Sequence, residues 1–327
     1  MERTALSILA LTIAYVLDHL IGDPSRFPHP VRILGAVIDL LENAARRLFI
    51  SPGGLKFSGF LIVVIAAGGS VFLTIILLTA AYRLNMAAGL LLELYIFFTV
   101  LAGGDLRNHV MKVGHYLKAG RLEKARSSVA LLVSRDTGSL NENGVSRAAL
   151  ESLFENSSDG LVGPLFFAAL GGAPLAVFYK AVNTLDSMLG YKSNEYLNLG
   201  CFAARIDDLL SFIPARLTAL FLILAGSGQG GFRRGLQALH ADRHKHQSPN
   251  SAWPEAAAAG VLDIRFGGAD FHQGKLREQP VINAQGKESE QKDIWRALDL
   301  FWRMSLLAFI CLLLISYWFR AWGLNYF

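Results

Sequence analysis

The feature that most constrains this chain is a set of long segments without charge. Residues 58–82 and 304–319 contain no Asp, Glu, Lys or Arg, and residues 86–103 contain only Glu93. A helix that spans a bilayer needs about 20 mostly apolar residues, so these three segments are predicted to span a membrane. They explain why only 17% of the residues are charged, whereas soluble proteins carry about 25%. The sequence therefore predicts an all-α, polytopic integral membrane protein and excludes a disordered or disulfide-scaffold protein.

Three further apolar segments are short or interrupted. Residues 4–17 are predicted to form a retained first helix rather than a signal peptide, because no cleavage-site pattern precedes the polar break. Residues 161–182 should form a re-entrant hairpin or a broken helix, because they contain several residues that interrupt a helical hydrogen-bond ladder. These residues are Pro164, Gly171, Gly172 and Pro174. Residues 209–225 contain Pro214 and Arg216, and an arginine at membrane depth usually faces a cavity or a partner.

Large polar segments separate the apolar ones. They are residues 22–57, 104–160, 183–208 and 226–303. All except residues 183–208 are rich in Lys and Arg, so the positive-inside rule places them in the cytoplasm. Residues 183–208 lie outside if residues 161–182 cross the membrane, and in the cytoplasm if they are re-entrant; the charges do not separate the two. We expect residues 1–327 to form one integral membrane domain whose polar segments contribute the functional site.

The polar segment around residues 135–164 contains a regular series of carboxylates. Glu151, Glu155 and Asp159 are four residues apart, so a continuous helix would place all three on one face. Like charges repel at this spacing, which makes sense if a cation or phosphate-bound Mg²⁺ lies against them. A solvated helix face is the ordinary alternative.

Two more strings place polar residues beside apolar helices. Residues 18–31 (DHLIGDPSRFPHPV) form a proline-rich turn around Asp23 and His29, for which a rigid loop is an equal alternative. Residues 179–196 (YKAVNTLDSMLGYKSNEY) directly follow the interrupted apolar segment. Because the ends of half-helices in membrane proteins direct their dipoles at ionic ligands, we expect a polar site there.

A fourth string, residues 242–268, reads DRHKHQSPNSAWPEAAAAGVLDIRFGG. His240, His244 and His246 resemble a metal cluster, but neither Cys nor a closely spaced second acidic ligand accompanies them, so a polar helix end followed by an SPN turn is favoured over zinc. No P-loop motif is present, and the glycines of residues 226–231 follow an apolar helix rather than a strand. The chain has no block of consecutive basic residues, so no nucleic-acid partner is indicated.

In this order the strings resemble those of the cobalamin-biosynthesis CbiB/CobD family, the adenosylcobinamide-phosphate synthases. The resemblance covers residues 18–268. It rests on GDP with PHPV, RDT, EN followed by DG, PLFF with GGAPLA, YKAVNTLDSMLGYK, AAR with DD and PARL, and SPN with AW, E and GG.

The resemblance implies an ATP-dependent amide synthetase with Mg²⁺. It would join adenosylcobyric acid to (R)-1-aminopropan-2-ol O-phosphate (aminopropanol phosphate), or to ethanolamine phosphate, and give adenosylcobinamide phosphate. It also implies a multi-pass protein of the cell inner membrane, with its site facing the cytoplasm and with the lipid bilayer and other late cobalamin-pathway membrane enzymes as partners. Because a carboxylate has to be activated before an amine attacks it, the site needs ligands for Mg²⁺ and basic groups for phosphates.

The matching motifs supply the expected site residues. Those expected to act in catalysis are Glu155, Asp159 and Asp186. Those expected to bind Mg²⁺ are Glu155, Asp159, Asp186, Asp207 and Asp208. Those expected to bind substrate are Asp23, His29, Arg135, Asn156, Lys180, Asn183, Thr184, Ser187, Lys192, Arg205 and Asn250.

Three other functions are compatible with this architecture. An AmpE-like sensor would be non-catalytic, and the acidic, lysine and amide residues of residues 179–196 argue against it. A transporter would use broken helices in the same way, but no inverted repeat is detectable. A non-catalytic corrinoid-binding subunit would need no ATP, so ATP hydrolysis coupled to amine addition would discriminate it from a synthetase.

Overall fold

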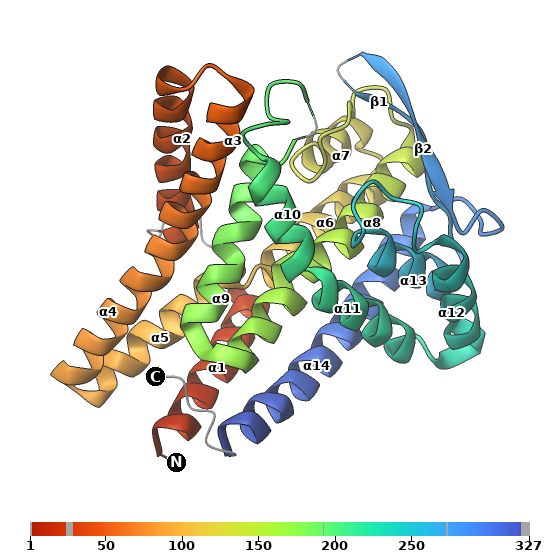
Figure 1. Ribbon diagram of the computed structural model, residues 1–327. Coiled ribbons are helices and arrows are strands. Elements are labelled where there is room, and N and C mark those ends of the chain that lie inside the picture. The colour runs from red at the N-terminus through yellow and green to blue at the C-terminus, as the bar shows by residue number, and fades with distance from the viewer. Residues whose placement is uncertain (1, 24–28, 192, 273, 322–327) are drawn as a thin grey trace. The chain divides into compact units, whose positions relative to one another are not determined.

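The computed structural model describes residues 2–23, 29–191, 193–272 and 274–321 (Figure 1). The chain packs as two compact units, each made of segments that are distant in sequence. Unit 1 comprises Met1–Ala102, Gly163–Ser211 and Cys311–Phe327, and unit 2 comprises Gly103–Val162 and Phe212–Ile310. The single domain over residues 1–327 remains a prediction.

Unit 1 is built from helices. They are α1 (Glu2–Ile21), α2 (Pro30–Leu48), α3 (Pro52–Val63), the π turn η1 (Val64–Gly68), α4 (Gly69–Leu84), α5 (Met86–Val100), α9 (Gly163–Leu189) and α10 (Cys201–Leu210). The longest helical run starts at α3, where the side chain of Ser51 accepts a hydrogen bond from the N–H of Gly54 and Pro52 occupies the first helical position. Both residue types favour a helix start at these positions.

Several helical stretches are long and apolar enough to cross a membrane. They are Pro52–Leu84, Met86–Lys118, Glu142–Leu189 and Gln291–Phe319. The bent pair Cys201–Leu210 and Phe212–Ala225 gives one more if it counts as one span. The predicted spans at residues 58–82, 86–103 and 304–319 lie inside three of these stretches, so the predicted membrane helices are confirmed. Residues 4–17 are helical, as predicted, within α1; that this helix is retained stays a prediction.

The interrupted segment at residues 161–182 forms a helical hairpin. Gly171 and Gly172 leave the helical region of φ/ψ space, and Gly172 has φ +66° and ψ −157°. The rings of Phe167 and Tyr179 stack with their centroids 5.0 Å apart, although twelve residues of straight helix would separate them by about 18 Å. The chain therefore reverses at the two glycines, and α9 forms two antiparallel arms (Figure 1). The predicted interruption of this segment is confirmed, and its re-entrance into a membrane stays a prediction.

Small residues allow the helices of unit 1 to pack closely where α2, α3, η1, α9 and α10 meet. The buried residues there include Ile38, Ala66, Ala67, Ala181, Leu185 and Ala203. Small side chains let helix backbones approach each other in membrane proteins. Gly59 is the extreme case, because a Cβ atom at this position would lie 2.0 Å from the carbonyl oxygen of Leu199.

Unit 2 contains helices and one β-hairpin. The helices are α6 (Gly103–Lys118), α7 (Leu122–Val129), α8 (Glu142–Ser157), the π turn η2 (Ser158–Val162), α11 (Phe212–Ala225), the 3₁₀ turn η3 (Gly228–Gly230), α12 (Gly231–Asp242), α13 (Ala252–Leu262) and most of α14 (Gln291–Ala321). The strands β1 (Phe266–His272) and β2 (Lys275–Ile282) pair antiparallel, with Phe266 opposite Ile282 and His272 opposite Lys275. The predicted all-α class is confirmed as a mostly helical fold. The hairpin was not predicted; within residues 104–160 and 226–303 the sequence indicated only a helix through Glu151 and Glu155 and a helix end before the SPN turn.

Candidate functional site

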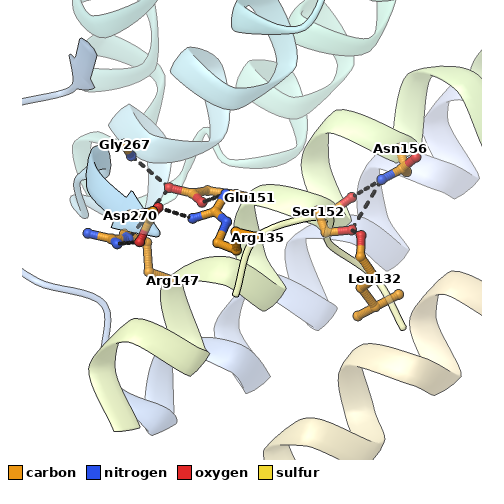
Figure 2. Close-up of polar contacts among 8 residues, drawn as sticks. All are labelled: Leu132, Arg135, Arg147, Glu151, Ser152, Asn156, Gly267 and Asp270. Carbon is orange, nitrogen blue, oxygen red and sulfur yellow. Dashed lines mark hydrogen bonds and ion pairs between the residues drawn. The ribbon is translucent and has the colours of Figure 1, made fainter. Parts of the chain in front are cut away.

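A buried network of four charged side chains joins α8 to the β-hairpin in unit 2 (Figure 2). Arg135 contacts Glu151 (Nη2 to Oε2, 2.6 Å) and Asp270 (Nη1 to Oδ2, 2.5 Å). Arg147 contacts the other oxygen of Asp270 at 2.6 Å. The backbone N–H of Gly267 donates to Glu151 Oε1 at 2.6 Å. Two positive and two negative charges balance, and buried charges are retained when they are paired in this way.

The start of α8 sets the direction of these side chains. The side chain of Asn141 accepts a hydrogen bond from the N–H of Gly144 at 2.8 Å and so caps the first turn. Counting from this start, Arg147 and Glu151 lie one turn apart on the same face. Both therefore face Asp270 on β1.

Arg135 is committed to this network. Burial alone would lower the pKa of its guanidinium, but the carboxylates of Glu151 and Asp270 raise it, and the pKa lies above its ordinary value. The group is permanently charged, and its two partners are within hydrogen-bond distance. Its predicted role in binding a substrate phosphate or carboxylate remains a prediction, and the contacts shown are to the protein itself.

Three potential metal ligands converge one turn further along α8. Oxygens of Glu155 and Glu255 and a ring nitrogen of His246 all lie within 4.8 Å of one another. Glu155 is on α8, Glu255 on α13, and His246 in the segment that follows α12. Glu155 also hydrogen-bonds to Ser251. Two carboxylates and an imidazole can hold a divalent cation.

Glu255 is the least satisfied member of this group. It is 6% exposed, and among the described residues no hydrogen bond or salt bridge reaches its carboxylate. Burial raises the pKa of the Glu255 carboxyl well above its ordinary value; the charges of Glu155 and Glu151 raise it further, and Arg135 offsets part of this effect. A buried carboxyl without a partner is costly, so the group is suited to bind a cation or to retain a proton.

The segment that carries His246 is held by local contacts. The N–H of Ser248 donates to His246 Nδ1 at 3.0 Å. Asn250, which is 6% exposed, accepts a hydrogen bond from Arg216 Nη1 at 3.2 Å. The guanidinium of Arg216 lies over the ring of Trp253 at 4.3 Å. The predicted substrate ligand Asn250 therefore lies in the same unit as Glu155, where it fixes the SPN turn.

The other predicted residues of α8 and η2 are placed differently from Glu155. The amide of Asn156 donates to the carbonyl oxygen and hydroxyl of Ser152, at 2.9 and 3.1 Å, so it is turned back along its own helix (Figure 2). Asp159 lies in the π turn η2 and is not one of the three converging ligands. A π turn changes which residues stack on one face, so the regular four-residue spacing no longer aligns Asp159 with Glu155.

Unit 1 holds a second group of predicted residues, on α9 after the reversal and on α10. Asn183 donates to Asp207 at 3.4 Å, and Asp207 also accepts from Ser211, whose hydroxyl lies 3.1 Å from that of Tyr179. The hydroxyls of Thr184 and Ser187 bond carbonyl oxygens one turn back in the same helix. The same two helices carry Lys180, Asp186, Arg205 and Asp208. The structure therefore brings Asn183 and Asp207 together within unit 1.

Two predicted residues lie at the start of α2. His29 Nε2 is 3.8 Å from Asp23 Oδ2, and Arg32 contacts the same oxygen at 3.4 Å. Asp23 and His29 are therefore neighbours, as the string around them suggests. Lys192 and residues 24–28 lie outside the described residues.

Comparison with known proteins places this architecture in a family. The family model described as CobD/Cbib protein matches residues 11–301. The chain belongs to the CobD/CbiB family. It is 40% identical over 318 residues to the cobalamin biosynthesis protein CobD of Klebsiella pneumoniae, covering 96% of this chain and 98% of that protein. It is 39% identical to CbiB of Salmonella arizonae over 314 residues, covering 96% and 98%, and 39% identical to CobD of Clostridium perfringens over 313 residues, covering 94% and 98%. No solved structure matches the chain.

Sequence reasoning did not select several residues that this CobD/CbiB chain assembles around Glu151 and Glu155. They are Arg147, His246, Glu255 and Asp270. Glu255 is the glutamate of the motif SPN with AW, E and GG. The motif was recognised in the sequence, but the position of Glu255 in the site was not. His246 was considered only together with His240 and His244, whereas its metal-ligating neighbours in the structure are glutamates. These contacts connect positions about 100 residues apart, and spacing along the chain gives no signal for them.

Proposed function

We propose that the protein is an ATP-dependent amide synthetase of cobalamin biosynthesis. It joins the carboxylate of adenosylcobyric acid to the amine of aminopropanol phosphate, or of ethanolamine phosphate, and yields adenosylcobinamide phosphate. Membership of the CobD/CbiB family supports the pathway, because the relatives are named as cobalamin biosynthesis proteins. The structural observation that carries the proposal is the convergence of the buried Glu255 with Glu155 and His246.

The reaction consists of an activation step and an amine attack. A carboxylate oxygen of the corrinoid attacks the γ-phosphorus of ATP, and ADP leaves. The amine then attacks the acyl carbon of the acyl phosphate, and inorganic phosphate leaves. Before that attack the ammonium group of the amino-alcohol phosphate has to lose a proton to a base. Asp159 and Asp186 remain our candidates for accepting this proton.

The two carboxylates of the three-ligand group fit the Mg²⁺ that the family implies, whereas its imidazole is not a ligand that Mg²⁺ favours. Magnesium is usually bound by one or two carboxylates together with substrate phosphates. Glu155 and Glu255 offer two carboxylates, and Glu255 has no competing hydrogen bond among the described residues. The ion would neutralise charge on the phosphates during transfer. Asp186, Asp207 and Asp208 stay as predicted ligands.

Positive charge for the phosphates and corrinoid carboxylates has separate sources. In unit 1, Lys180 on α9 and Arg205 on α10 remain the predicted ligands, and Arg205 is exposed. Arg135 is held by two carboxylates, so we propose that it positions Glu151 and the hairpin instead. Asn183, Thr184, Ser187 and Asn250 would orient substrate by hydrogen bonds.

We propose that the site faces the cytoplasm, in the cell inner membrane. The candidate spans indicate a multi-pass membrane protein. We propose that the hairpin in α9 is re-entrant, so that residues 183–208 share a side with the polar segment before residue 161. The basic residues of that preceding segment favour the cytoplasm, and ATP is available there. The proposed partners are the lipid bilayer and other late-pathway membrane enzymes.

An assay on the detergent-purified chain tests the proposal. Adenosylcobyric acid, aminopropanol phosphate and Mg-ATP should give a product whose mass matches the amide, with release of ADP. Glu155→Gln and Asp186→Asn should lower the rate by about 100-fold or more, on the scale of losing one acid–base or charge-stabilising group. Glu123→Gln is the matched control, because its side chain is 82% exposed.

Two results would contradict the synthetase. Protein that binds the corrinoid but forms no amide and hydrolyses no ATP would be a binding subunit. Protein that binds no corrinoid would have a different function. Normal turnover by Glu155→Gln would remove the three-ligand group from the proposed site.

A further inference from the structure

The ligand set at Glu155, Glu255 and His246 contains a nitrogen as well as two carboxylate oxygens. We infer that these side chains hold a resident first-row transition-metal dication, such as Mn²⁺ or Zn²⁺, and that they bind it in preference to Mg²⁺ and without nucleotide. This inference names the ion of the proposed active site and rests on the proposed function only for its use in catalysis. Binding of the metal itself does not depend on the reaction.

The need for a cation follows from charge and burial. Glu255 is 6% exposed and receives no hydrogen bond or salt bridge among the described residues, and one of its oxygens lies within 4.8 Å of the ligand atoms of Glu155 and His246. Among the described residues, Arg135 is the cation that acts electrostatically on Glu155 and Glu255. Its guanidinium already contacts Glu151 and Asp270. When Glu155 and Glu255 are both ionised, two negative charges lie close together and have to be balanced. A single dication balances both.

The choice of metal follows from the imidazole. Mg²⁺ is a hard ion that takes oxygen ligands in near-ideal octahedral geometry, and it gains little from a ring nitrogen. Zinc and other first-row transition ions accept mixed nitrogen and oxygen ligands, and sites with three protein ligands keep a position open for water or substrate. Three protein ligands leave such a position for a phosphate oxygen.

Binding of a metal by His246 should change the hydrogen bond that the imidazole ring accepts from Ser248. Ser248 N–H donates to Nδ1, so the metal-free neutral ring carries its proton on Nε2. Ligation through Nε2 moves the ring proton to Nδ1 and opens this hydrogen bond. The bond lies at the exposed surface, and its loss is small beside a metal–ligand interaction.

The test uses Mn²⁺ alone, added to the full chain in nanodiscs after removal of any histidine tag. Electron paramagnetic resonance should show one saturable site per chain in the absence of ATP. Pulsed measurements should detect coupling to a ¹⁴N nucleus. His246→Ala should abolish the coupling and weaken binding at least about tenfold, and Glu255→Gln should weaken it similarly. His244→Ala is the control, because His244 is exposed and outside the three-ligand group.

Competition identifies the preference. Zn²⁺ should displace Mn²⁺ at comparable or lower concentration, as the general order of affinities requires, whereas Mg²⁺ should need at least about a 100-fold excess. The inference is overturned if Mn²⁺ binding does not saturate, if the ¹⁴N coupling persists in His246→Ala, or if Mg²⁺ competes equally. Thermal melting of each variant verifies folding, and Glu255→Gln is nearly isosteric. Metal binding without amide formation would reject the proposed reaction and leave the metal site in place.

Discussion

Asp270→Asn should be among the most destabilising conservative substitutions in unit 2. The Asp270 side chain is 1% exposed and accepts from Arg135 at 2.5 Å and from Arg147 at 2.6 Å. The amide removes one negative charge and leaves two buried guanidinium groups against Glu151 alone. Breaking a buried ion pair by removing one partner costs about 3–5 kcal/mol. For a unit of this size, about 2–4 °C per kcal/mol gives a fall in melting temperature of about 6–20 °C.

Thermal unfolding of the detergent-solubilised chain measures this change, with tryptophan fluorescence as the signal. Glu123→Gln is the matched control, because Glu123 contacts Arg126 at the same 2.6 Å that separates Arg135 from Glu151, but its side chain is 82% exposed. An exposed pair contributes at most about 1 kcal/mol. The difference in melting temperature between Asp270→Asn and Glu123→Gln therefore reports the effect of burial at a similar contact distance.

A double variant tests whether the four charges act as a network. Arg147→Gln combined with Asp270→Asn restores neutrality, so its loss of stability should be smaller than the sum of the single losses. Asp270→Asn within about 1 kcal/mol of the wild type, or strictly additive single effects, would refute the reasoning that a balanced buried network holds the β-hairpin to α8.

Other substitutions test the hairpin in α9 and the carboxylate pair. Gly172→Ala should cost about 1–3 kcal/mol of stability, because φ +66° with ψ −157° is essentially restricted to glycine. Gly69→Ala is the control, because Gly69 has a helical φ of −62° and open space around it. Equal melting temperatures of the two variants would contradict the reversal. With metal chelated, stability should fall as pH rises from about 4.3 through the raised pKa of Glu255, since the folded state then binds more protons than the unfolded state. Glu255→Gln should flatten this dependence in a melting series, and an unchanged slope would argue against it. Tyr179→Phe should cost about 1 kcal/mol by removing the hydroxyl that lies 3.1 Å from Ser211, measured by the same melts, and no loss would mean that this bond contributes nothing.

The membrane helices could be predicted because hydrocarbon length imposes a strict local rule. An uncharged run such as residues 58–82 has few folds available other than a spanning helix. The reversal at Gly171 and Gly172 was also readable, since a glycine pair followed by Pro174 cannot continue a helix cleanly. Both inferences use only residues that are close in sequence.

The polar segments were harder to predict because their apolar contacts lie far away in the chain. Gly114 on α6, for example, packs against Ile294 on α14, where a Cβ atom would lie 2.9 Å from the isoleucine side chain. Without that contact, residues 105–118 look like a polar loop rather than a packed helix. The β-hairpin is similar, because β1 is stabilised through Asp270, and its arginine partners belong to α8 and the segment before it.

The candidate site was predictable in its residue types but not in its grouping. Glu155 was selected by its spacing, and the structure places it where a cation ligand would be useful. The same spacing included Asp159, which the π turn η2 separates from that position. Glu255 lies in the site because α13 packs on α8, and no local sequence pattern predicts that contact.

The hairpin in α9 also determines what the membrane has to accept during biogenesis. Residues 161–179 carry no charge, and the tip of the hairpin is made of Gly171 and Gly172. The apolar arm before the tip is about 15 Å long, half of a hydrocarbon core of about 30 Å. If the hairpin is re-entrant, no polar loop has to be translocated, whereas each charge placed at the bilayer centre costs about 2.5–3.5 kcal/mol in translocon insertion. A re-entrant segment of this kind can be inserted after the spanning helices are in place, and the polar residues that follow it then stay on the side from which the chain entered.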